Sequence, residues 1–371
     1  MRPFSLLVKP ASADCNLDCS YCFYKDKTAL YPDTPRHRMW NETLEAMIRR
    51  FFEAEQPEYA FAWQGGEPTL MGQEFFERAV ELQARYAPAG SRVTNGLQTN
   101  GTLIDDAFAA FLAKNEFLVG ISIDGPAAVH DRYRVTRDGR GSHDGVLRGL
   151  EALRRHGVDF NVLALVTQAN VADPSGLYTY LKEIGARYHQ YIPCVEFEPD
   201  GEPAPYSIGG REWGRFLTGL FDAWAQSDTE TVSIRLFDSV LQKLLTGRAN
   251  VCHMGKDCRH YFVVEHSGDV YPCDFYVEAE RRLGNVHTDR FTELWRSPAY
   301  RRFGREKKNW GATCDACPYL QLCAGDCPKM RTGDASHPSV LCEGWKQFYA
   351  HSLHRFEELA DAFRAGTLRR A

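Results

Sequence analysis

The sequence lacks the features that mark membrane proteins and general nucleic-acid binders. It contains no run of about 18 uncharged apolar residues, so no membrane-spanning helix is expected. Neither charge sign dominates, because 44 Lys and Arg stand against 49 Asp and Glu, a net charge of -5, whereas a protein that binds nucleic acid or anionic lipid is usually basic. The N-terminal segment MRPFSLLVKP has too short an apolar run for a secretion signal, which predicts a cytoplasmic protein.

Two groups of catalytic motifs are also missing. The chain has no Walker-type loop and no GxGxxG after a strand, so phosphate and dinucleotide chemistry have no support. Its 12 histidines include no HExxH pair or similar metal-binding spacing.

Cysteine is absent between Cys22 and Cys194, although the chain holds 12 cysteines in total. Three lie near the N-terminus, and eight lie between residues 252 and 342. Disulfide scaffolds are usually short and rich in cysteine throughout, so this distribution argues against disulfides. Clustered thiols in a cytosolic chain instead indicate ligands of metal ions or of iron–sulfur clusters.

The first half of the chain alternates strand and helix patterns. Apolar residues make up 44 % of the sequence, enough for a sizeable core. Six β/α units predict a parallel sheet with helices outside it, and they fall short of the eight units of a closed barrel. The expected fold class is therefore α/β, a partial (β/α)6 TIM-type barrel. The expected strands are 4–9, 59–63, 92–98, 117–123, 159–166 and 188–192, and the expected helices are 42–52, 73–86, 105–114, 142–156 with Ser142 as N-cap, and 174–184.

The second half has a different texture. A loop is expected at 196–210, followed by helices at 211–225 and 234–246 and by a hairpin of strands 261–264 and 270–275. Residues 300–342 have little periodicity and many cysteines, so bound ligands rather than a core should hold them. The expected domains are a barrel at 1–232, a cysteine-rich domain at 233–342 and a C-terminal helix at 343–371.

Cys15, Cys19 and Cys22 follow the first expected strand, at the sheet edge where parallel α/β folds bind ligands. Three thiolates on one loop can hold three irons of a [4Fe-4S] cube and leave the fourth iron open to a small molecule. A structural zinc site would need a fourth ligand, and none is nearby in the sequence. Tyr21 places an aromatic ring beside the last cysteine.

The segment CNLDCSYC resembles the signature of the radical S-adenosylmethionine (SAM) superfamily. The turn GGEP after the next strand is similar to the GGE motif of that superfamily, which implies that the backbone at Gly66 approaches the methionine amino group of SAM. The resemblance further implies SAM contacts from Tyr21, Ser122, Arg134 and Val195. Without it, Arg134 is equally a surface charge and Val195 equally a packing residue.

The eight C-terminal cysteines make two sets of four, and spacing alone leaves their assignment open and also permits two zinc-ribbon sites. The pattern resembles the SPASM domain of radical SAM enzymes that modify peptides. That resemblance implies two auxiliary [4Fe-4S] clusters and, with the N-terminal site, cofactors of three [4Fe-4S] clusters and SAM. The implied ligands are Cys252, Cys258, Cys273 and Cys327 for auxiliary cluster I, and Cys314, Cys317, Cys323 and Cys342 for auxiliary cluster II.

Segments along the whole chain, among them FAWQGGEPTL, LQTNGTLID, VGISIDGP and VYPCDFY, are similar to the anaerobic sulfatase-maturating enzymes. The resemblance implies that a 5′-deoxyadenosyl radical removes a hydrogen from Cβ of a sulfatase Cys or Ser, which becomes Cα-formylglycine. The implied partners are a sulfatase segment of the type Cys/Ser-x-Pro-x-Arg and an electron donor such as flavodoxin or ferredoxin, with no nucleic acid and no membrane. Two alternatives remain: a SPASM maturase that forms thioether or carbon–carbon crosslinks in a precursor peptide, and a zinc-bound interaction module.

Asp274 directly follows the expected cluster ligand Cys273, and the resemblance implies that it is the general base. The alternative is an Asp that forms a turn at the end of the hairpin. Tyr24 and Gln64 adjoin the cysteine loop and the GGEP turn, and both are candidate substrate contacts. Cys194 is left over, either as a buried free cysteine at a strand end or as a residue lining the active site.

Overall fold

The computed structural model describes residues 2–332 and 337–367. The chain divides into two compact units, and each unit combines segments that are distant in the sequence. Unit 1 contains residues 1–122, 133–160 and 259–304, and unit 2 contains residues 123–132, 161–258 and 305–371. In the described segments, no helix has the length and apolarity needed to cross a membrane.

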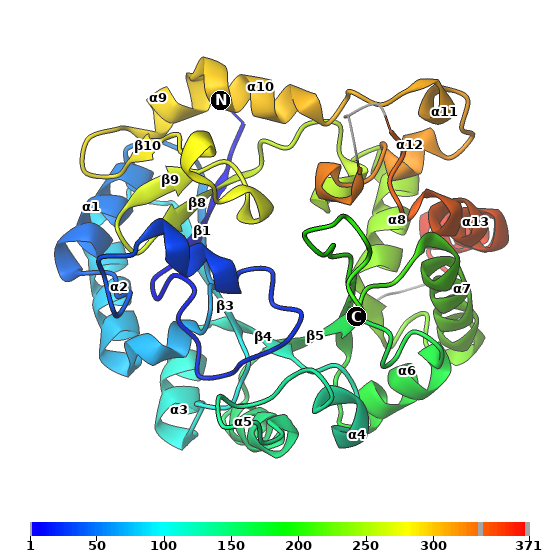
Figure 1. Cartoon of the computed structure of the whole chain (residues 1–371), viewed down its shortest axis with the longest axis horizontal. Helices are drawn as coiled ribbons and strands as arrows, with labels where there is room; N and C mark the ends of the chain where they lie inside the picture. The colour runs from blue at the N-terminus through cyan, green and yellow to red at the C-terminus, as the bar shows by residue number, and fades with distance from the viewer. Residues whose placement is uncertain (1, 333–336, 368–371) are drawn as a thin grey trace. The chain divides into compact units, whose positions relative to one another are not determined.

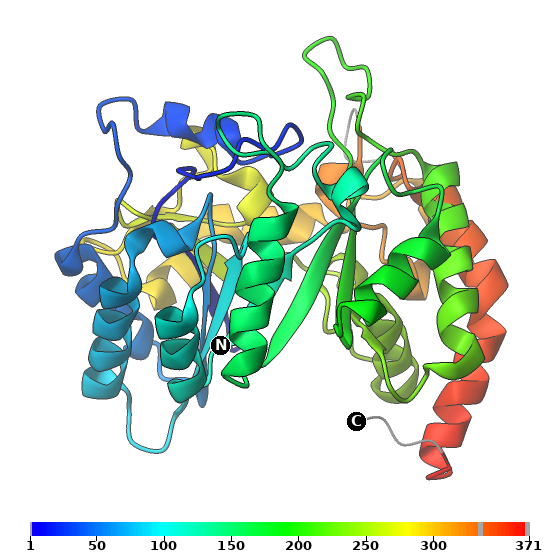
Figure 2. The same ribbon diagram turned by 90° about the horizontal axis from the view of Figure 1, so that it is seen from below.

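Unit 1 is built on a mixed sheet with the strand order β10-β9-β8-β1-β2-β3-β4. Strands β8 and β1 to β4 run parallel, whereas β9 and β10 run antiparallel to their neighbours. Helices α1, α2 and α3 lie along the sheet (Figures 1 and 2). The elements are β1 Ser5–Lys9, η1 Lys25–Leu30, α1 Asn41–Phe52, β2 Glu58–Trp63, η2 Pro68–Met71, α2 Gln73–Tyr86, β3 Arg92–Thr99, α3 Asp106–Lys114, β4 Leu118–Ser122, α5 His143–Arg155, β8 Tyr261–Glu265, β9 Asp269–Tyr271, η4 Asp274–Tyr276, η5 Ala279–Arg281, β10 Gly284–Asn285, α9 Phe291–Arg296 and α10 Pro298–Glu306, the last of which runs across the boundary into unit 2.

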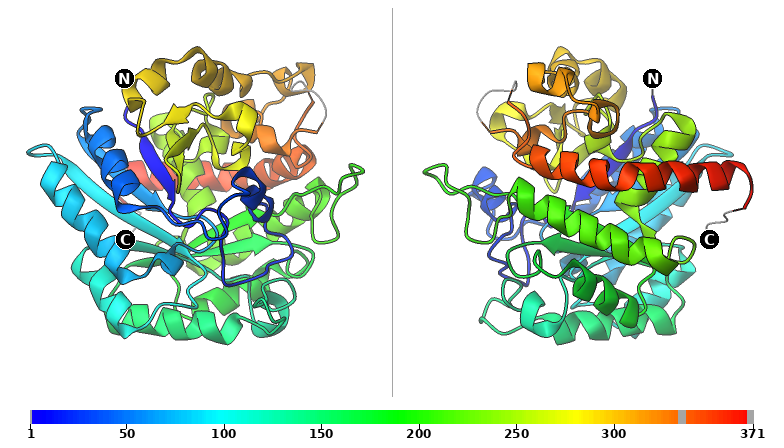
Figure 3. Two further views of the ribbon diagram at one scale, coloured as in Figure 1. Left: turned by 60° about the vertical axis from the view of Figure 1, so that its left-hand side comes forward. Right: turned by 90° about the vertical axis from the view of Figure 1, so that its right-hand side faces the viewer.

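Unit 2 contains the parallel strands β5, β6 and β7 and the helices that follow them. The long C-terminal helix α13 lies along α7 (Figure 3), and Phe221 of α7 packs against Phe356 of α13 with ring centroids 4.8 Å apart. The elements are α4 Ala127–His130, β5 Phe160–Val166, α6 Pro174–Glu183, β6 Tyr188–Pro193, α7 Gly210–Ser227, β7 Ser233–Ile234, α8 Arg235–Thr246, η3 Cys252–Met254, α11 Ala312–Asp315, α12 Leu320–Cys323, η6 Pro328–Met330 and α13 Cys342–Arg364.

The alternation of strands and helices confirms the β/α repeat predicted for the first half of the chain. The observed ends of its strands and helices differ from the expected ones by at most one residue. The local pattern is sufficient because each amphipathic helix buries one face, as α2 does with Phe75, Phe76, Ala79 and Leu82. The domain boundaries stay a prediction, and residues 368–371 of the expected C-terminal segment lie outside the described residues.

Three local expectations need correction. Ser142 is the N-cap residue of α5 as expected, but its hydroxyl donates to the Arg134 carbonyl (2.8 Å) and makes no capping hydrogen bond. Strand β9 ends at Tyr271, since Pro272 has no N–H to donate to the ladder, and the chain turns into η4. Residues 298–306 form the amphipathic helix α10, which buries Tyr300 and Phe303.

The hairpin of β8 and β9 belongs to the same sheet as the N-terminal strand β1. Strand β8 pairs in parallel with β1, and Lys9 at the end of β1 is in register with Glu265 at the end of β8. This pairing joins a segment from the second half of the chain to the strand that leads into the cysteine loop. It also brings the turn after β9, with Cys273 and Asp274, into unit 1.

Candidate active site and cluster-binding cysteines

Cys15, Cys19 and Cys22 line one pocket of unit 1, on the loop that follows β1. The loop is held from the side by the segment after α4, because the backbone N–H groups of Asp18 and Ser20 donate to the carbonyls of Val135 and Tyr133. The other residues that line this pocket are Ala13, Asp14, Leu17, Asp18, Lys25, Thr28 and Arg137. The structure therefore brings the three thiols predicted to share one cluster together in one concave site.

The GGEP turn packs directly against the start of this loop. The N–H of Gly66 donates to the Ser12 carbonyl (2.7 Å), and the N–H of Glu67 donates to the Asp14 carbonyl (2.8 Å). A Cβ on Gly66 would lie 2.1 Å from the Asp14 carbonyl oxygen, so only glycine permits this approach.

The Gly66→Ala variant should therefore displace the cysteine loop and weaken SAM binding by about tenfold or more. Equilibrium binding of SAM to the reconstituted protein measures this effect. Gly96→Ala in β3 is the matched control, because a Cβ there meets its nearest atom at 3.8 Å. Unchanged SAM affinity in Gly66→Ala would contradict a role for this close approach.

Glu67 is a fully buried carboxylate that the sequence reasoning did not single out. Burial raises its pKa, and bonds from the Asn100 N–H (2.8 Å), from the Thr69 N–H (3.0 Å) and hydroxyl (2.7 Å), and from the Thr99 hydroxyl (2.7 Å) oppose that rise. Glu67 thus ties the GGEP turn to the end of β3. The sequence signal that could have identified Glu67 was its position in the GGE motif.

The residues expected to contact SAM are divided between the units. In unit 1, Arg134 donates to the Tyr21 hydroxyl (2.9 Å), and Ser122 accepts a hydrogen bond from Gln98 (3.1 Å). Gly66 lies in the turn described above, whereas Val195 is a buried residue of unit 2. Arg134 is itself only 8 % exposed, which argues against the interpretation that it is a surface charge.

Asn100 is a further polar residue beside the cysteine loop that the sequence analysis missed. Its side-chain amide lies 3.8 Å from the Cys15 sulfur and donates to Asn16 (2.9 Å), and Asn16 in turn donates to Thr102 (2.9 Å). The signal for Asn100 was its place just after β3, at the same sheet edge as the cysteine loop.

Asp274 is paired with a buried lysine. The Lys9 ammonium lies 2.5 Å from Asp274 Oδ1, and Lys9 is only 1 % exposed. Gln64, directly before the two glycines, donates to Asp274 Oδ2 at 3.5 Å. The structure thus places Asp274 beside both the end of β1 and the GGEP turn, and its role as general base stays a prediction.

Tyr24 completes this cluster. Its ring centroid lies 4.0 Å from the Lys9 ammonium, and its hydroxyl donates to Glu265, which is fully buried. Burial, and then the carboxylates of Glu265 and Asp274, raise the pKa of Tyr24, so the phenol stays protonated. Lys9 and Glu265 escaped the sequence reasoning because a single charged residue at a strand end is usually solvated.

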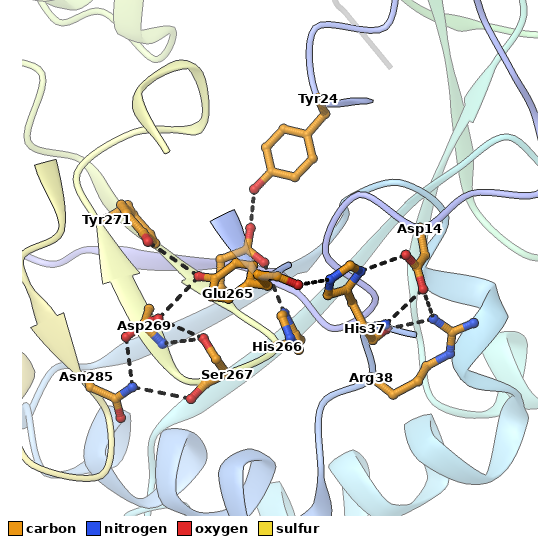
Figure 4. A network of polar contacts seen from close by, with 11 residues as sticks. Asp14, Tyr24, His37, Arg38, Glu265, His266, Ser267, Asp269, Tyr271 and Asn285 are labelled. Carbon is orange, nitrogen blue, oxygen red and sulfur yellow. Dashed lines mark hydrogen bonds and ion pairs between the residues drawn. The ribbon is translucent and has the colours of Figure 1, made fainter. Parts of the chain in front are cut away.

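A chain of contacts, polar except for one contact between two histidine rings, continues from Glu265 to the cysteine loop (Figure 4). Glu265 Oε2 lies 3.5 Å from His266 Nδ1, and the His266 ring packs edge-on against His37 (4.9 Å). His37 donates to the Asp14 carboxylate through its backbone N–H (2.9 Å) and ring Nδ1 (2.8 Å). Burial alone would raise the pKa of Asp14, but hydrogen bonds from His37 and Arg38 outweigh it and lower this pKa. Asp14 directly precedes Cys15.

A second group of cysteines meets in unit 2. Cys314, Cys317, Cys323 and Cys342 line one small cavity with Trp345 and Lys346. These are the four residues that the resemblance assigns to auxiliary cluster II. Of the other set, Cys252, Cys258 and Cys327 belong to unit 2, whereas Cys273 belongs to unit 1, where its sulfur lies 3.4 Å from the Tyr261 hydroxyl.

Burial disfavours the ionised form of six of these thiols. Burial raises the pKa of Cys15 to about 12 and of Cys258 to about 11, and it also raises the pKa of Cys252, Cys314, Cys323 and Cys342. Such thiols ionise at neutral pH only when a metal centre displaces the proton. Among residues 2–332 and 337–367, no three His, Cys, Asp or Glu side chains converge closely enough for a single metal ion.

Cys194, the cysteine outside all three sets, is buried just after β6. Its backbone N–H donates to the Val166 carbonyl and its carbonyl accepts from Ile208, both at 2.9 Å. Burial raises the pKa of its thiol to about 12. Its burial after β6, outside the three groups of expected ligands, favours a packing role.

Comparison with known proteins agrees with the motifs. The family model "Radical SAM superfamily" matches residues 10–178, and the model "Iron-sulfur cluster-binding domain" (SPASM) matches residues 252–318. A serine-type anaerobic sulfatase-maturating enzyme of Bacteroides thetaiotaomicron is 37 % identical over 94 % of this chain and 89 % of its own length. A cysteine-type enzyme of Clostridium perfringens is also 37 % identical, over 97 % of this chain and 99 % of its own length.

A solved structure, native anSMEcpe with bound AdoMet and Kp18Cys peptide, matches with a TM-score of 0.91 at 37 % identity, covering 97 % of this chain and 99 % of that one. The match confirms the predicted fold, a partial barrel with a SPASM domain. The chain therefore belongs to the anaerobic sulfatase-maturating enzymes of the radical SAM superfamily.

Proposed function

We propose that this protein oxidises a Cys or Ser side chain of a sulfatase polypeptide to Cα-formylglycine. The observation that supports the proposal is a set of contacts within unit 1: the GGEP turn bonds to the start of the three-cysteine loop, and Gln64, just before that turn, contacts Asp274, which pairs with Lys9. A carboxylate held beside the expected site of radical formation can take the proton that leaves the substrate.

The cofactors are three [4Fe-4S] clusters and SAM, which when bound supply the 5′-deoxyadenosyl radical and accept the electron released by the substrate. The side chains of this protein hold and orient these groups. Cys15, Cys19 and Cys22 would hold the first cluster. Auxiliary cluster I would be held by Cys252, Cys258, Cys273 and Cys327, and auxiliary cluster II by Cys314, Cys317, Cys323 and Cys342.

The remaining roles are those that the resemblance to the family implies. The backbone at Gly66, the Tyr21–Arg134 pair, Ser122 and Val195 would bind SAM. Asp274 would take the proton as general base, and Gln64 and Tyr24 would face the peptide. Tyr24 is only 2 % exposed, its hydroxyl donates to Glu265 and its ring lies against the Lys9 ammonium, so the half-buried Gln64 is the more accessible of these two candidate contacts.

Lys9→Met should lower the free energy of unfolding by about 3 kcal/mol or more, since breaking a buried ion pair leaves the partner carboxylate uncompensated. Denaturant unfolding measures this loss. Asp274→Asn in the Lys9→Met background should cost less than Asp274→Asn alone, because the two residues interact directly.

Lys25→Met is the matched control for the Lys9 variant. Lys25 also forms an ion pair, with Asp18, but both side chains are about half exposed. Its loss should cost less than about 1 kcal/mol. If Lys9→Met and Lys25→Met lowered the free energy of unfolding equally, or if the losses from Lys9→Met and Asp274→Asn were strictly additive, the buried ion pair would not contribute to stability as predicted.

The activity is tested with the reconstituted, reduced protein, SAM and a short peptide that contains Cys-x-Pro-x-Arg or its Ser version. Mass spectrometry should show loss of the thiol or hydroxyl and gain of an aldehyde, and comparison of the two peptides defines the target residue. Metal analysis should find roughly twelve irons per chain. A colourless zinc protein would overturn the proposal, and 5′-deoxyadenosine without any change in the peptide would favour a crosslinking maturase.

The proposal also covers the electron donor and the cellular location of the enzyme. We infer a low-potential donor such as flavodoxin or ferredoxin and a cytoplasmic site of action. Substitution of dithionite by either protein in the peptide assay tests the donor.

A further inference from the structure

Unit 2 contains a fully buried lysine at the end of α10. Lys307 is 0 % exposed, and its ammonium donates to the carbonyls of His253 (2.9 Å) and Asp326. In the part of the chain that the structure describes, Lys307 forms no ion pair with a carboxylate. A buried ammonium satisfied only by neutral carbonyls needs a compensating negative charge.

The two carbonyls that bind Lys307 belong to neighbours of cluster ligands. His253 follows Cys252, and Asp326 precedes Cys327. The ammonium also acts electrostatically on Cys258 of the same set and on Cys323 of the other set. Lys307 therefore lies among ligands of both expected auxiliary clusters.

The carboxylate of Asp326, next to Cys327, accepts hydrogen bonds from donors other than Lys307. Asp326 accepts hydrogen bonds from the Cys327 N–H (2.7 Å), the Ser339 hydroxyl (2.6 Å) and the Trp345 indole (2.9 Å). Lys307 meets only the backbone carbonyl of this residue. Although it makes no direct ion pair, the Asp326 carboxylate is the charge that acts most strongly on Lys307, ahead of the Cys258 and Cys327 thiols, so the ammonium compensates both this carboxylate and the thiolates.

Arg331 adds a second cation to this region. It is 9 % exposed, and its guanidinium donates to the carbonyls of Gly325 (2.8 Å) and Lys307 (3.0 Å). It acts electrostatically on Cys258 and Cys314, one from each set. The bond from the Arg331 guanidinium to the Lys307 carbonyl holds the segment that carries the lysine.

We propose that Lys307 is the built-in counter-charge of the auxiliary clusters and raises their reduction potential. The inference rests on the proposed ligand assignment. Four thiolates outweigh the positive charge of an oxidised [4Fe-4S] core, and one-electron reduction adds a further negative charge to a buried site. A fixed ammonium nearby stabilises the reduced state more than the oxidised one, and net charge is one of the determinants of cluster potential. A higher potential favours electron acceptance from the substrate.

The test removes the charge in a background where only the auxiliary clusters remain, the triple variant Cys15→Ala, Cys19→Ala and Cys22→Ala. In that background, Lys307→Met and Lys307→Gln should shift the reduction potential of at least one cluster to more negative values in a redox titration followed by electron paramagnetic resonance. Lys307→Arg should keep the parent potentials. Lys308→Met is the matched control, because Lys308 is the adjacent lysine and is exposed.

Each result has a defined meaning. Roughly eight irons per chain in the background variant show that the auxiliary clusters form, and their absence would overturn the ligand assignment itself. Full iron content with parent potentials in both neutral variants would overturn the role of Lys307 alone. If the neutral variants fail to load iron while Lys307→Arg loads it, the charge is needed for assembly and the inference stands. Loss of iron in Lys307→Arg as well would overturn it.

Discussion

Asp274→Asn should leave SAM cleavage intact and lower formylglycine formation by about 10²- to 10⁴-fold, the usual contribution of a general base. Asn keeps the size of the side chain and a partner for Gln64, but its amide cannot take a proton from the substrate. The Lys9 ammonium, 2.5 Å from Asp274 Oδ1, holds the carboxylate in place. Chromatography of 5′-deoxyadenosine and mass spectrometry of the peptide, on the same reaction, measure both yields.

The control for this variant is Glu280→Gln, which neutralises an exposed carboxylate on the same stretch of chain after β9. It should retain both activities. A normal formylglycine yield from Asp274→Asn would remove Asp274 from the mechanism. Loss of SAM cleavage together with formylglycine would instead assign it to the binding of SAM or to the folding of the site.

Replacement of Cys15, Cys19 and Cys22 by Ala should abolish SAM cleavage completely. These thiols line a single pocket, and burial keeps the Cys15 thiol protonated unless iron is bound. The iron content should fall from roughly twelve to roughly eight per chain, because one cluster of three is lost. Iron analysis and the 5′-deoxyadenosine assay provide the two measurements.

Cys194→Ala is the matched control for the triple variant. Cys194 is buried, and burial raises the pKa of its thiol to about 12, as it does for Cys15. Cys194 belongs to none of the three ligand sets. We expect unchanged iron content and activity. Iron loss in Cys194→Ala, or an unchanged iron content in the triple variant, would show that the cysteines are sorted incorrectly.

The sequence was sufficient wherever the physical signal is local. The apolar spacing of α2 and the strand patterns before and after it define elements whose ends the structure reproduces to within one residue. Local reasoning failed at Ser142, where the Arg134 carbonyl, another part of the chain, competes for the hydroxyl. The eight C-terminal cysteines show the same limit, since their spacing permits several ways of assigning four ligands to each of two clusters.

The sequence by itself determined the β/α order, the three-cysteine loop after the first strand and the family, because these depend on residues close together in the chain. Only the tertiary structure decided that β8 pairs with β1, that Lys9 meets Asp274, and that Lys307 is buried among the cysteines of unit 2. The physical reason is that a lone lysine carries no pattern. Its charge acquires a role only when folding removes water and brings a distant carboxylate or thiolate to it.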